Sequence, residues 1–290
     1  MRVPFAALVS SLVLAVLPVL WVYAAHADTL DTIRSRGAII IGYREGAPPF
    51  SSADAQGKPQ GYSIDLCNRI ADAVKAKLGM SDLKVQYVPV TAENRIDKLE
   101  SGAIDIECGS TTRTLGRQER VDFTLFIFVT GTELLVLENS DIHGPDDLKT
   151  NKKIAVQSGT TTETAIKRLI SASGGKAQIV PVHSSDEGLA LVESGKADAY
   201  ASDEVVLIGL ASAAKSPRGL RLSGQLYSYE PYALMVRKND SAFRLIADRT
   251  LAQIYESDDI VKIWQRWFGQ WAPQPPIVLK MMYAMEALSP

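Results

Sequence analysis

The feature that most constrains the fold is an alternation of strand-like and helix-like segments along most of the chain. Short apolar runs, such as 38–43 and 153–156, are followed by segments in which apolar residues recur every three or four positions. The clearest of these predicts a helix over 63–78 that ends at Gly79. Strands that alternate with helices usually pair through helical crossovers, so the sequence predicts an α/β fold with largely parallel sheets.

The predicted elements form two successive series. The first has strands at 38–43, 83–90 and 104–106, helices at 63–78 and 95–101, and an extended segment at 125–137. The second has strands at 153–156, 178–182 and 197–201, and helices at 160–171, 184–194 and 203–213. A strand at 232–237, helices at 241–254 and 260–268, and an extended proline-rich tail follow.

A short motif occurs in both series. Glu-Ser-Gly at 100–102 is followed by Asp105, and Glu-Ser-Gly at 193–195 is followed by Asp198. In each series the motif lies between a predicted helix and a predicted strand. The repetition suggests two lobes of the same build.

The first 27 residues have the features of a secretory signal peptide. Arg2 precedes an apolar stretch, and small residues at positions 25 and 27 come just before Asp28, a pattern that signal peptidase cleaves. We expect export of residues 28–290, and the alternative is an uncleaved membrane anchor. In an oxidising compartment Cys67 and Cys108 could form a disulfide, although two buried thiols fit the pattern equally well.

Composition and motifs exclude several classes of function. With a formal net charge of −2, 46% hydrophobic and 22% charged residues, the chain is neither a nucleic-acid binder nor a multi-span membrane protein. The three histidines are scattered, and no Walker loop, nucleophile elbow or dinucleotide fingerprint is found in the sequence. We therefore expect no metal, no cofactor and no catalytic residues.

Two segments carry groups that bind a carboxylate. The Cys-Gly-Ser-Thr-Thr string at 108–112, followed by Arg117, and the Gln-Ser-Gly-Thr-Thr string at 157–161 each come directly after a predicted strand. Hydroxyls, backbone N–H groups and a planar guanidinium make charge-assisted hydrogen bonds to a carboxylate at this edge of a sheet. The alternative is that these hydroxyls cap helices, as the capping-box spacing of Thr160 and Glu163 indicates.

The chain also contains a set of strings with a distinctive order and spacing. They are TLDTIRSRG at 29–37, GYREGAPPFS at 42–51, GYSIDLC at 61–67, ENRID at 93–97, DIECGSTT at 105–112, SGTTTE at 158–163 and LVESGKADAYASDE at 191–204. Together they resemble the periplasmic amino-acid-binding proteins of ABC importers, solute-binding family 3, and most closely the glutamate/aspartate-binding branch. The resemblance covers essentially all of residues 28–290.

The resemblance implies a two-lobed periplasmic binding protein fold of type II. Two α/β lobes are joined by two hinge strands, and the lobes close on a ligand held in the cleft between them. After a signal peptide at 1–27, lobe 1 is expected to begin with 28–131. Lobe 2 would then cover 132–229, and 230–290 would return to lobe 1 and form the C-terminal tail.

The resemblance also implies roles for residues at the α-carbon end of an amino acid. Arg117 is expected to hold the α-carboxylate, and Asp203 the α-ammonium. The hydroxyl residues expected to assist Arg117 are Ser110, Thr112, Thr160 and Thr161. The simpler alternatives are that Arg117 pairs with Glu119 on the surface and that Asp203 merely caps the following helix.

Two further arginines bear on side-chain specificity. Arg44 and Arg95 match positions that face the ligand side chain in glutamate/aspartate binders, although each could instead be solvated or salt-bridged. The chain departs from those relatives at two places: Ala92 replaces a hydroxyl residue, and Ser185 stands near a histidine position. Both departures remove expected contacts to a distal carboxylate.

The function expected from the resemblance is that of a periplasmic substrate-binding component of an ABC transporter. It would capture glutamate or aspartate by lobe closure and deliver it to a membrane permease, as a monomer. Glutamine, asparagine or broad polar amino-acid binding is the alternative. A dehydratase-like enzyme on the same fold is less favoured because no acid or base is expected in the cleft, and a sensor domain would continue into a membrane span.

Overall fold

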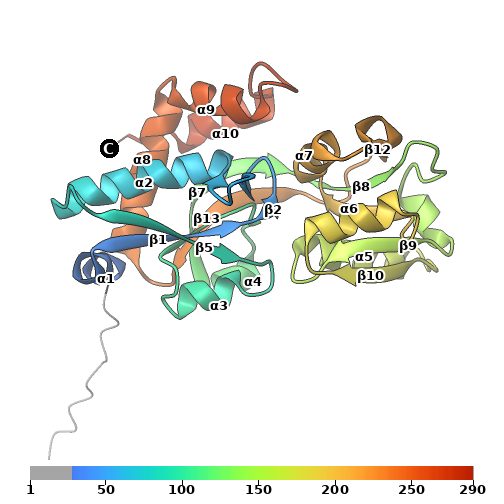
Figure 1. Cartoon of the computed structure of the whole chain (residues 1–290), viewed down its shortest axis with the longest axis horizontal. Coiled ribbons are helices and arrows are strands. Elements are labelled where there is room, and N and C mark those ends of the chain that lie inside the picture. The colour runs from blue at the N-terminus through green and yellow to red at the C-terminus, as the bar shows by residue number, and fades with distance from the viewer. Residues whose placement is uncertain (1–27, 290) are drawn as a thin grey trace, which may run out of the picture.

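The computed structural model describes residues 28–289, so the predicted signal peptide lies outside the described residues. Two α/β lobes, each built on a five-stranded sheet, lie side by side and are joined by two extended connections (Figure 1). The chain leaves the first sheet after β7 (Val121–Thr130), enters the second with β8 (Thr132–Leu137), and later returns with β13 (Glu230–Arg237). The expected two-lobed α/β architecture is confirmed.

The first lobe combines a mixed sheet with seven helices among the described residues. Its strands before the crossing are β1 (Ala38–Arg44), β2 (Gly46–Ala47), β3 (Ser51–Ala53), β4 (Pro59–Gln60), β5 (Lys84–Val90) and β6 (Ile106–Cys108). Its helices are α1 (Thr29–Arg36), α2 (Tyr62–Leu78), α3 (Arg95–Glu100), α4 (Leu115–Gln118), α8 (Ser241–Glu256), α9 (Asp259–Phe268) and α10 (Ile277–Glu286). The main sheet has the order β5-β1-β6-β13-β7, and β2, β3 and β4 form a small separate sheet.

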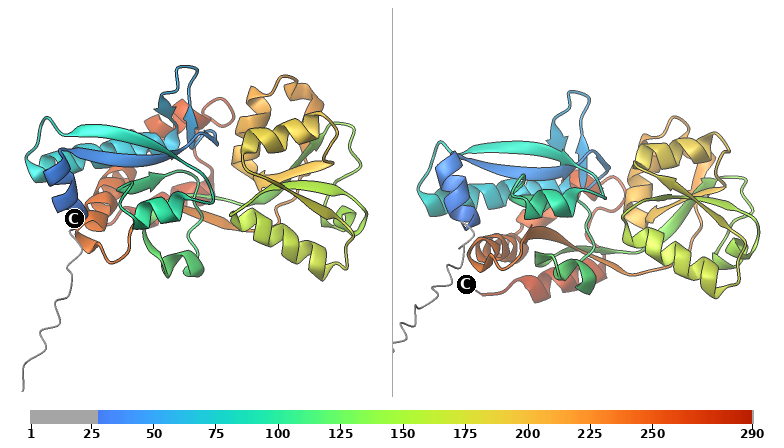
Figure 2. Two further views of the ribbon diagram at one scale, coloured as in Figure 1. Left: turned by 60° about the horizontal axis from the view of Figure 1, so that its bottom comes forward. Right: turned by 90° about the horizontal axis from the view of Figure 1, so that it is seen from below.

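The second lobe is smaller and has helices on both faces of its sheet (Figure 2). Its further strands are β9 (Lys153–Gln157), β10 (Gln178–Val182), β11 (Ala199–Asp203) and β12 (Leu220–Leu222). Its helices are α5 (Thr161–Ala172), α6 (Ser185–Glu193) and α7 (Glu204–Ala213), with short 3₁₀ turns at Pro145–Lys149 and Pro217–Gly219. The strand order is β10-β9-β11-β8-β12.

The prediction of largely parallel sheets was wrong for half of each sheet. β1 pairs in parallel with β5 and β6, and β9 pairs in parallel with β10 and β11. The strands that the chain uses to cross between lobes are antiparallel to their neighbours: β13 against β6 and β7, and β8 against β11 and β12. These strands enter each sheet from the other lobe without a helical crossover, so nothing forces them to run parallel.

Burial on both faces of the second sheet explains its apolar strands. In β8, Leu134 and Val136 pack in the cluster that contains Ile166 of α5, whereas Leu135 packs in the cluster that contains Leu207 of α7. Successive side chains of a strand point to opposite faces, so a sheet covered on both sides needs a continuous apolar run. The apolar runs that predicted buried strands are therefore explained by a lobe of three layers, with the sheet between two layers of helices.

The repeated Glu-Ser-Gly motif marks equivalent positions in the two lobes. It ends α3 in one lobe and α6 in the other, with Gly102 at φ 76° and Gly195 at φ 66°. The carboxylate of Asp105 then accepts a hydrogen bond from a backbone N–H of β1, and that of Asp198 accepts one from the first residue of β9. In both lobes, therefore, the motif ends a helix and the aspartate that follows it binds the backbone of a neighbouring strand.

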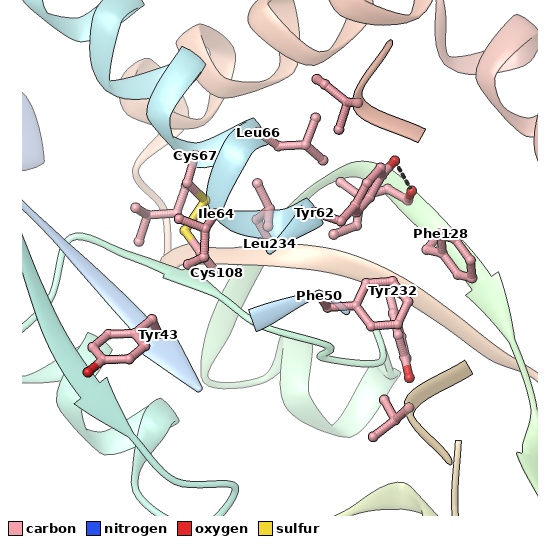
Figure 3. Close-up of a cluster of buried hydrophobic side chains, with 14 of the residues drawn as sticks. Tyr43, Phe50, Tyr62, Ile64, Leu66, Cys67, Cys108, Phe128, Tyr232 and Leu234 are labelled. Carbon is pink, nitrogen blue, oxygen red and sulfur yellow. Dashed lines mark hydrogen bonds between the residues drawn. A yellow bond between two sulfur atoms is a disulfide. The ribbon is translucent and has the colours of Figure 1, made fainter. Parts of the chain in front are cut away.

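The expectation of an extended tail was wrong. The three prolines at 273–276 are followed by α10, whose Leu279, Met282 and Tyr283 are buried. The Tyr283 hydroxyl lies 2.9 Å from the hydroxyl of Tyr62. Tyr62 belongs to the cluster of buried side chains, among them Phe50 and Phe128, that Figure 3 shows. Proline is tolerated at a helix start, so the proline cluster does not prevent a helix from forming directly after it. No helix in the described part of the chain is long and apolar enough to span a membrane.

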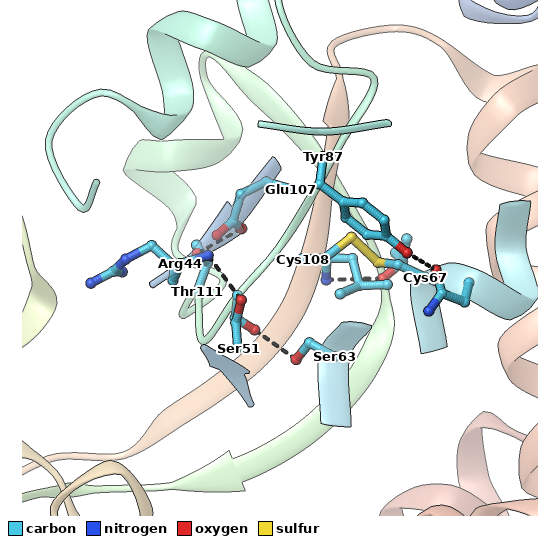
Figure 4. Close-up of a disulfide and its surroundings, with 12 residues drawn as sticks. Arg44, Ser51, Ser63, Cys67, Tyr87, Glu107, Cys108 and Thr111 are labelled. Carbon is cyan, nitrogen blue, oxygen red and sulfur yellow. Dashed lines mark hydrogen bonds between the residues drawn. A yellow bond between two sulfur atoms is a disulfide. The ribbon is translucent and has the colours of Figure 1, made fainter. Parts of the chain in front are cut away.

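The structure joins Cys67 of α2 to Cys108 of β6 by a disulfide (Figure 4). The sequence alone left this pairing open. The bond ties the helix to the strand that leads into the loop at 109–112. Ser63 strengthens the same connection, because its hydroxyl donates a hydrogen bond of 2.7 Å to the carbonyl of Gly109.

Candidate ligand-binding site

A narrow pocket lies between the lobes, and both of them line it. All eight residues predicted for the ligand site line it: Arg44, Arg95, Ser110, Thr112, Arg117, Thr160, Thr161 and Asp203. Residues far apart in the sequence are therefore brought together in one pocket.

The elements explain this convergence. Arg44 ends β1, the loop at 109–112 follows β6, α5 begins just after β9, and Asp203 ends β11. The carboxyl ends of the parallel strands of both sheets thus meet at the pocket, which is the edge where open α/β sheets bind ligands. Each lobe supplies one half of the lining.

Two of the three arginines in the pocket are hydrogen-bonded across the lobes. Nη2 of Arg44 donates a hydrogen bond of 3.0 Å to Oε1 of Gln157. Nη1 of Arg117 donates one of 2.7 Å to the Thr112 carbonyl, and its Nη2 donates one of 3.5 Å to the Gly159 carbonyl. The surface ion pair of Arg117 with Glu119 that the sequence left open is not among the ion pairs of residues 28–289.

Arg95 differs from both. It is 2% exposed, its Nε is buried without a hydrogen-bond partner, and no hydrogen bond from its guanidinium is found among the described residues. Burial lowers the pKa of Arg95 well below its ordinary value, and the positive charges of Arg117 and Arg44 lower it further. Burial also lowers the pKa of Arg44 and Arg117, while nearby Glu107 acts in the opposite direction. Arg95 is therefore a buried cation in the pocket that has no hydrogen-bond partner within residues 28–289.

Asp203 supplies negative charge at the pocket. It occupies the N-cap position of α7, but its side chain makes no capping hydrogen bond. Its carboxylate instead accepts hydrogen bonds from the hydroxyls of Tyr232 and Thr162. Burial, assisted by the negative charge of Glu230, raises the pKa of Asp203 to about 7. The alternative that Asp203 merely caps α7 is therefore wrong.

Thr160 does cap a helix. Its hydroxyl accepts a hydrogen bond of 3.1 Å from the Glu163 N–H and donates one of 2.7 Å to the Gln157 carbonyl. The N–H groups of Thr161 and Thr162 in the first turn of α5 have no acceptor among the described residues. Free N–H groups at a helix start attract anions.

The comparisons with known proteins identify the family. Residues 39–270 match the bacterial extracellular solute-binding proteins, family 3. The chain belongs to this family. It is 40% identical over 261 residues to the glutamate/aspartate import solute-binding protein of Salmonella typhimurium, covering 90% of this chain and 85% of that protein.

Two further likenesses extend over most of this family 3 protein. It is 37% identical over 286 residues to the L-glutamate/L-aspartate-binding protein of Pseudomonas aeruginosa, covering 98% of this chain and 94% of the relative. A solved structure of a mutant of ArgBP from T. maritima matches with a TM-score of 0.73 at 28% identity, covering 83% and 99% of the two chains. The chain is thus a solute-binding protein and not an enzyme.

Ser185 and Ala92, the two departures from the glutamate/aspartate binders, differ in their position relative to the pocket. Ser185 lines the pocket and is 2% exposed. Ala92 is buried but does not line the pocket; its carbonyl oxygen is 3.2 Å from the position that a Cβ on Gly159 would take. A side chain at Ala92 is therefore close to the place where the lobes approach each other.

Sequence reasoning did not assign several polar residues in the pocket lining or directly behind it; Thr162 and Ser202 are two of those in the lining. Gln157 holds Arg44, Tyr232 holds Asp203, and the carboxylates of Glu107 and Glu230 are almost completely buried beside them. A charged residue within an apolar strand, as Glu107 is, was a usable signal of a buried acid. Residues 28–289 contain no group of three or more histidine, cysteine or acidic side chains that could hold a metal ion.

Proposed function

We propose that this protein is the periplasmic substrate-binding component of an ABC importer and that it captures an acidic amino acid, glutamate or aspartate. The observation that carries the proposal is the buried guanidinium of Arg95, which lines the pocket without a hydrogen-bond partner among the described residues. A buried charge is costly unless it is paired, so this cation calls for an anion on the ligand. The names of the Salmonella and Pseudomonas relatives support the same ligands.

The ligand would bridge the lobes by its charged ends. Arg117 and the N–H groups at the start of α5 hold the α-carboxylate, with Ser110, Thr112, Thr160 and Thr161 around it. Asp203 holds the α-ammonium, and Arg44 and Arg95 hold the distal carboxylate. Planar guanidinium groups suit this task because they bind carboxylates in a bidentate manner.

Capture would occur by closure of lobe 2 (132–229) on lobe 1 (28–131 with 230–290) about the strand connections β7–β8 and β12–β13. The closed form would dock on a membrane permease and release the amino acid to it. The protein would act as a monomer after removal of residues 1–27. The hydrogen bonds from Arg44 to Gln157 and from Arg117 to Gly159 join the two parts in the present arrangement.

Amide or broader specificity is the second candidate, and a specific observation favours it. Arg44 is already hydrogen-bonded to Gln157 and lies beside the buried Glu107, which leaves Arg95 as the guanidinium free to take a distal group. One cation of this kind can bind an amide oxygen as well as a carboxylate. Glutamine and asparagine therefore belong in the same test.

The test is a thermal-shift screen of the mature protein, refolded after removal of any co-purified ligand, against the twenty amino acids. A ligand that binds only the folded state raises Tm by mass action. Stabilisation by glutamate and aspartate alone would support the proposal, whereas stabilisation by glutamine or many polar amino acids would support the second candidate. No response to any amino acid would contradict both.

Two variants test the assigned roles in the same screen. Arg117→Ala is expected to abolish the response to every amino acid because all of them share the α-carboxylate. Arg95→Ala is expected to weaken the response to acidic ligands selectively. Loss of one partner of a buried charge pair costs on the order of 2 to 5 kcal/mol. Full glutamate binding by Arg117→Ala would contradict the α-carboxylate assignment.

A further inference from the structure

A buried carboxylate behind the ligand pocket connects the two lobes through hydroxyl groups. Glu230, the first residue of β13, is 3% exposed. Its Oε2 accepts hydrogen bonds from Oγ1 of Thr112 at 2.5 Å and from Oγ1 of Thr161 at 2.7 Å, and its Oε1 accepts one from Ser228 at 2.6 Å. None of the ion pairs found within residues 28–289 involves Glu230. Hydroxyl donors, not cations, hold this charge.

Only one of the two threonine contacts depends on how the lobes are placed. Thr112 is fixed beside Glu230 by two backbone hydrogen bonds between residues 111–113 and 231–233. Thr161 is the first residue of α5 and belongs to the second lobe. Separating the lobes would break the Thr161–Glu230 contact and leave the Thr112–Glu230 contact intact.

Both threonines line the ligand pocket and also a groove on its outer side, whereas Glu230 lines only the groove. The threonines therefore stand between Glu230 and a ligand, and Glu230 does not touch the ligand. A residue in this place acts through others, so it is a positioning residue.

The direction of the two hydroxyl hydrogen bonds determines which donors of Thr112 and Thr161 remain available to a ligand. Each hydroxyl has one proton, and both protons are donated to Oε2 of Glu230. The threonines must therefore hold a carboxylate through their backbone N–H groups. Thr112 faces Tyr232 in an antiparallel bridge, and the backbone hydrogen bonds of this bridge are made by the residues on either side of Thr112. The Thr112 N–H therefore points away from β13 and has no acceptor among the described residues.

We propose that Glu230 is a latch residue that stabilises the closed form of the protein through Thr161. Closure brings the Thr161 hydroxyl to a carboxylate that already holds Thr112, so the hydrogen bond forms only when the lobes meet. The latch slows ligand release and has little effect on ligand entry into the open form. The inference rests on the proposed function, because it concerns the release of a ligand captured by closure.

The test measures association and dissociation rates of L-glutamate, and separately of L-glutamine, by stopped-flow tryptophan fluorescence. Thr161→Val keeps the shape of the side chain and removes the hydroxyl. We expect this variant to raise the dissociation rate about tenfold to a hundredfold, the range for one hydrogen bond to a charged group, with an association rate within about threefold of the parent. Thr161→Ser restores the hydroxyl and is expected to restore slow release.

Thr164→Val is the matched control. Thr164 lies one turn along α5, is exposed, lines the same groove and makes no hydrogen bond to Glu230. This variant is expected to release ligand at the parental rate. Glu230→Gln keeps the size of the side chain and can accept fewer of the hydroxyl protons, so its effect should not add to that of Thr161→Val.

The outcomes separate the latch from the function on which it rests. Parental release from Thr161→Val, faster release from Thr164→Val, or additive effects of Glu230→Gln and Thr161→Val would overturn the latch while leaving the proposed function intact. A fall in the Tm of unliganded Thr161→Val that Thr161→Ser does not reverse would also overturn it. Failure of the parent protein to bind either amino acid or any other would refute the proposed function and the latch together.

Discussion

The phenolic hydroxyl of Tyr232, on β13 of the first lobe, donates a hydrogen bond to the carboxylate of Asp203, at the end of β11 in the second lobe. Both side chains are buried. Burial is the main cause that raises the pKa of Asp203 to about 7, and the negative charge of Glu230 adds to it. The hydrogen bonds from Tyr232 and Thr162 act in the opposite direction without restoring the ordinary value.

Ligand affinity is therefore expected to depend on pH near neutrality. In the proposed binding mode the α-ammonium group pairs with Asp203 as a carboxylate, and a pKa of about 7 leaves much of Asp203 protonated below that pH. Affinity should fall as the pH is lowered from 8 to 5, and binding near pH 7 should release protons. Calorimetry in buffers of different ionisation enthalpy measures that release. Asp203→Asn is the control and should bind weakly without this pH dependence.

The same group should affect the stability of the unliganded protein with the opposite sign. The pKa of Asp203 is about 7 in the folded protein against an ordinary value of 3.8, so the folded state binds the proton more tightly. Its burial destabilises the fold fully above about pH 7, and this penalty is relieved as the pH falls towards 4. We expect the Tm difference between the parent and Asp203→Asn to shrink over that range. A constant difference would contradict the raised pKa.

Arg95 should be destabilising in the absence of ligand. Its guanidinium is buried without a partner among the described residues, and an unsatisfied buried polar group costs about 1 to 3 kcal/mol. Arg95→Met is therefore expected to raise the Tm of the unliganded protein by several degrees while weakening glutamate binding. Arg44→Met is the comparison, because it leaves the Gln157 amide without its donor and should not stabilise. A lower Tm for Arg95→Met would show that the guanidinium is satisfied in solution.

The sequence predicted the parts of the fold that depend on local pattern. The apolar runs of β9 and β10, the period of α2 with its stop at Gly79, and the repeated Glu-Ser-Gly motif all lie within a residue or two of their predicted places. Burial on one or both faces of an element produces these patterns directly. The eight expected site residues converge on one pocket for a related reason: most of them lie at or after the carboxyl ends of parallel strands, and these ends of the two sheets meet at the pocket.

What the sequence could not supply depends on contacts between distant segments. The antiparallel pairing of β8 and β13 follows from how the chain crosses between lobes, which no local pattern encodes. The Cys67–Cys108 bond requires knowing that α2 packs against β6. The role of Glu230 is equally hidden, since its three hydroxyl partners come from residues 112, 161 and 228.

The disulfide is expected to contribute to stability more than to ligand binding. It closes a segment of 41 residues, for which the chain-entropy account gives about 4 kcal/mol. The loop at 109–112 that it supports is also held by Ser63 and by the bridge to β13. Replacing both cysteines by alanine should lower Tm by roughly 10 °C, with glutamate affinity reduced less than about tenfold. A large loss of affinity at a temperature where the variant is folded would show that the bond positions the site.

Gly159 provides the most direct test of closure. It has φ 75°, and a Cβ there would lie 3.2 Å from the carbonyl oxygen of Ala92 in the other lobe. Gly195 has φ 66° with no atom within 4 Å of the corresponding position. Gly159→Ala and Gly195→Ala should therefore share the backbone strain of about 1 kcal/mol and similar losses of Tm. Only Gly159→Ala places a methyl group between the lobes, so only this variant should weaken ligand binding. Equal affinities for the two variants would show that the ligand-bound lobes do not approach each other at Gly159.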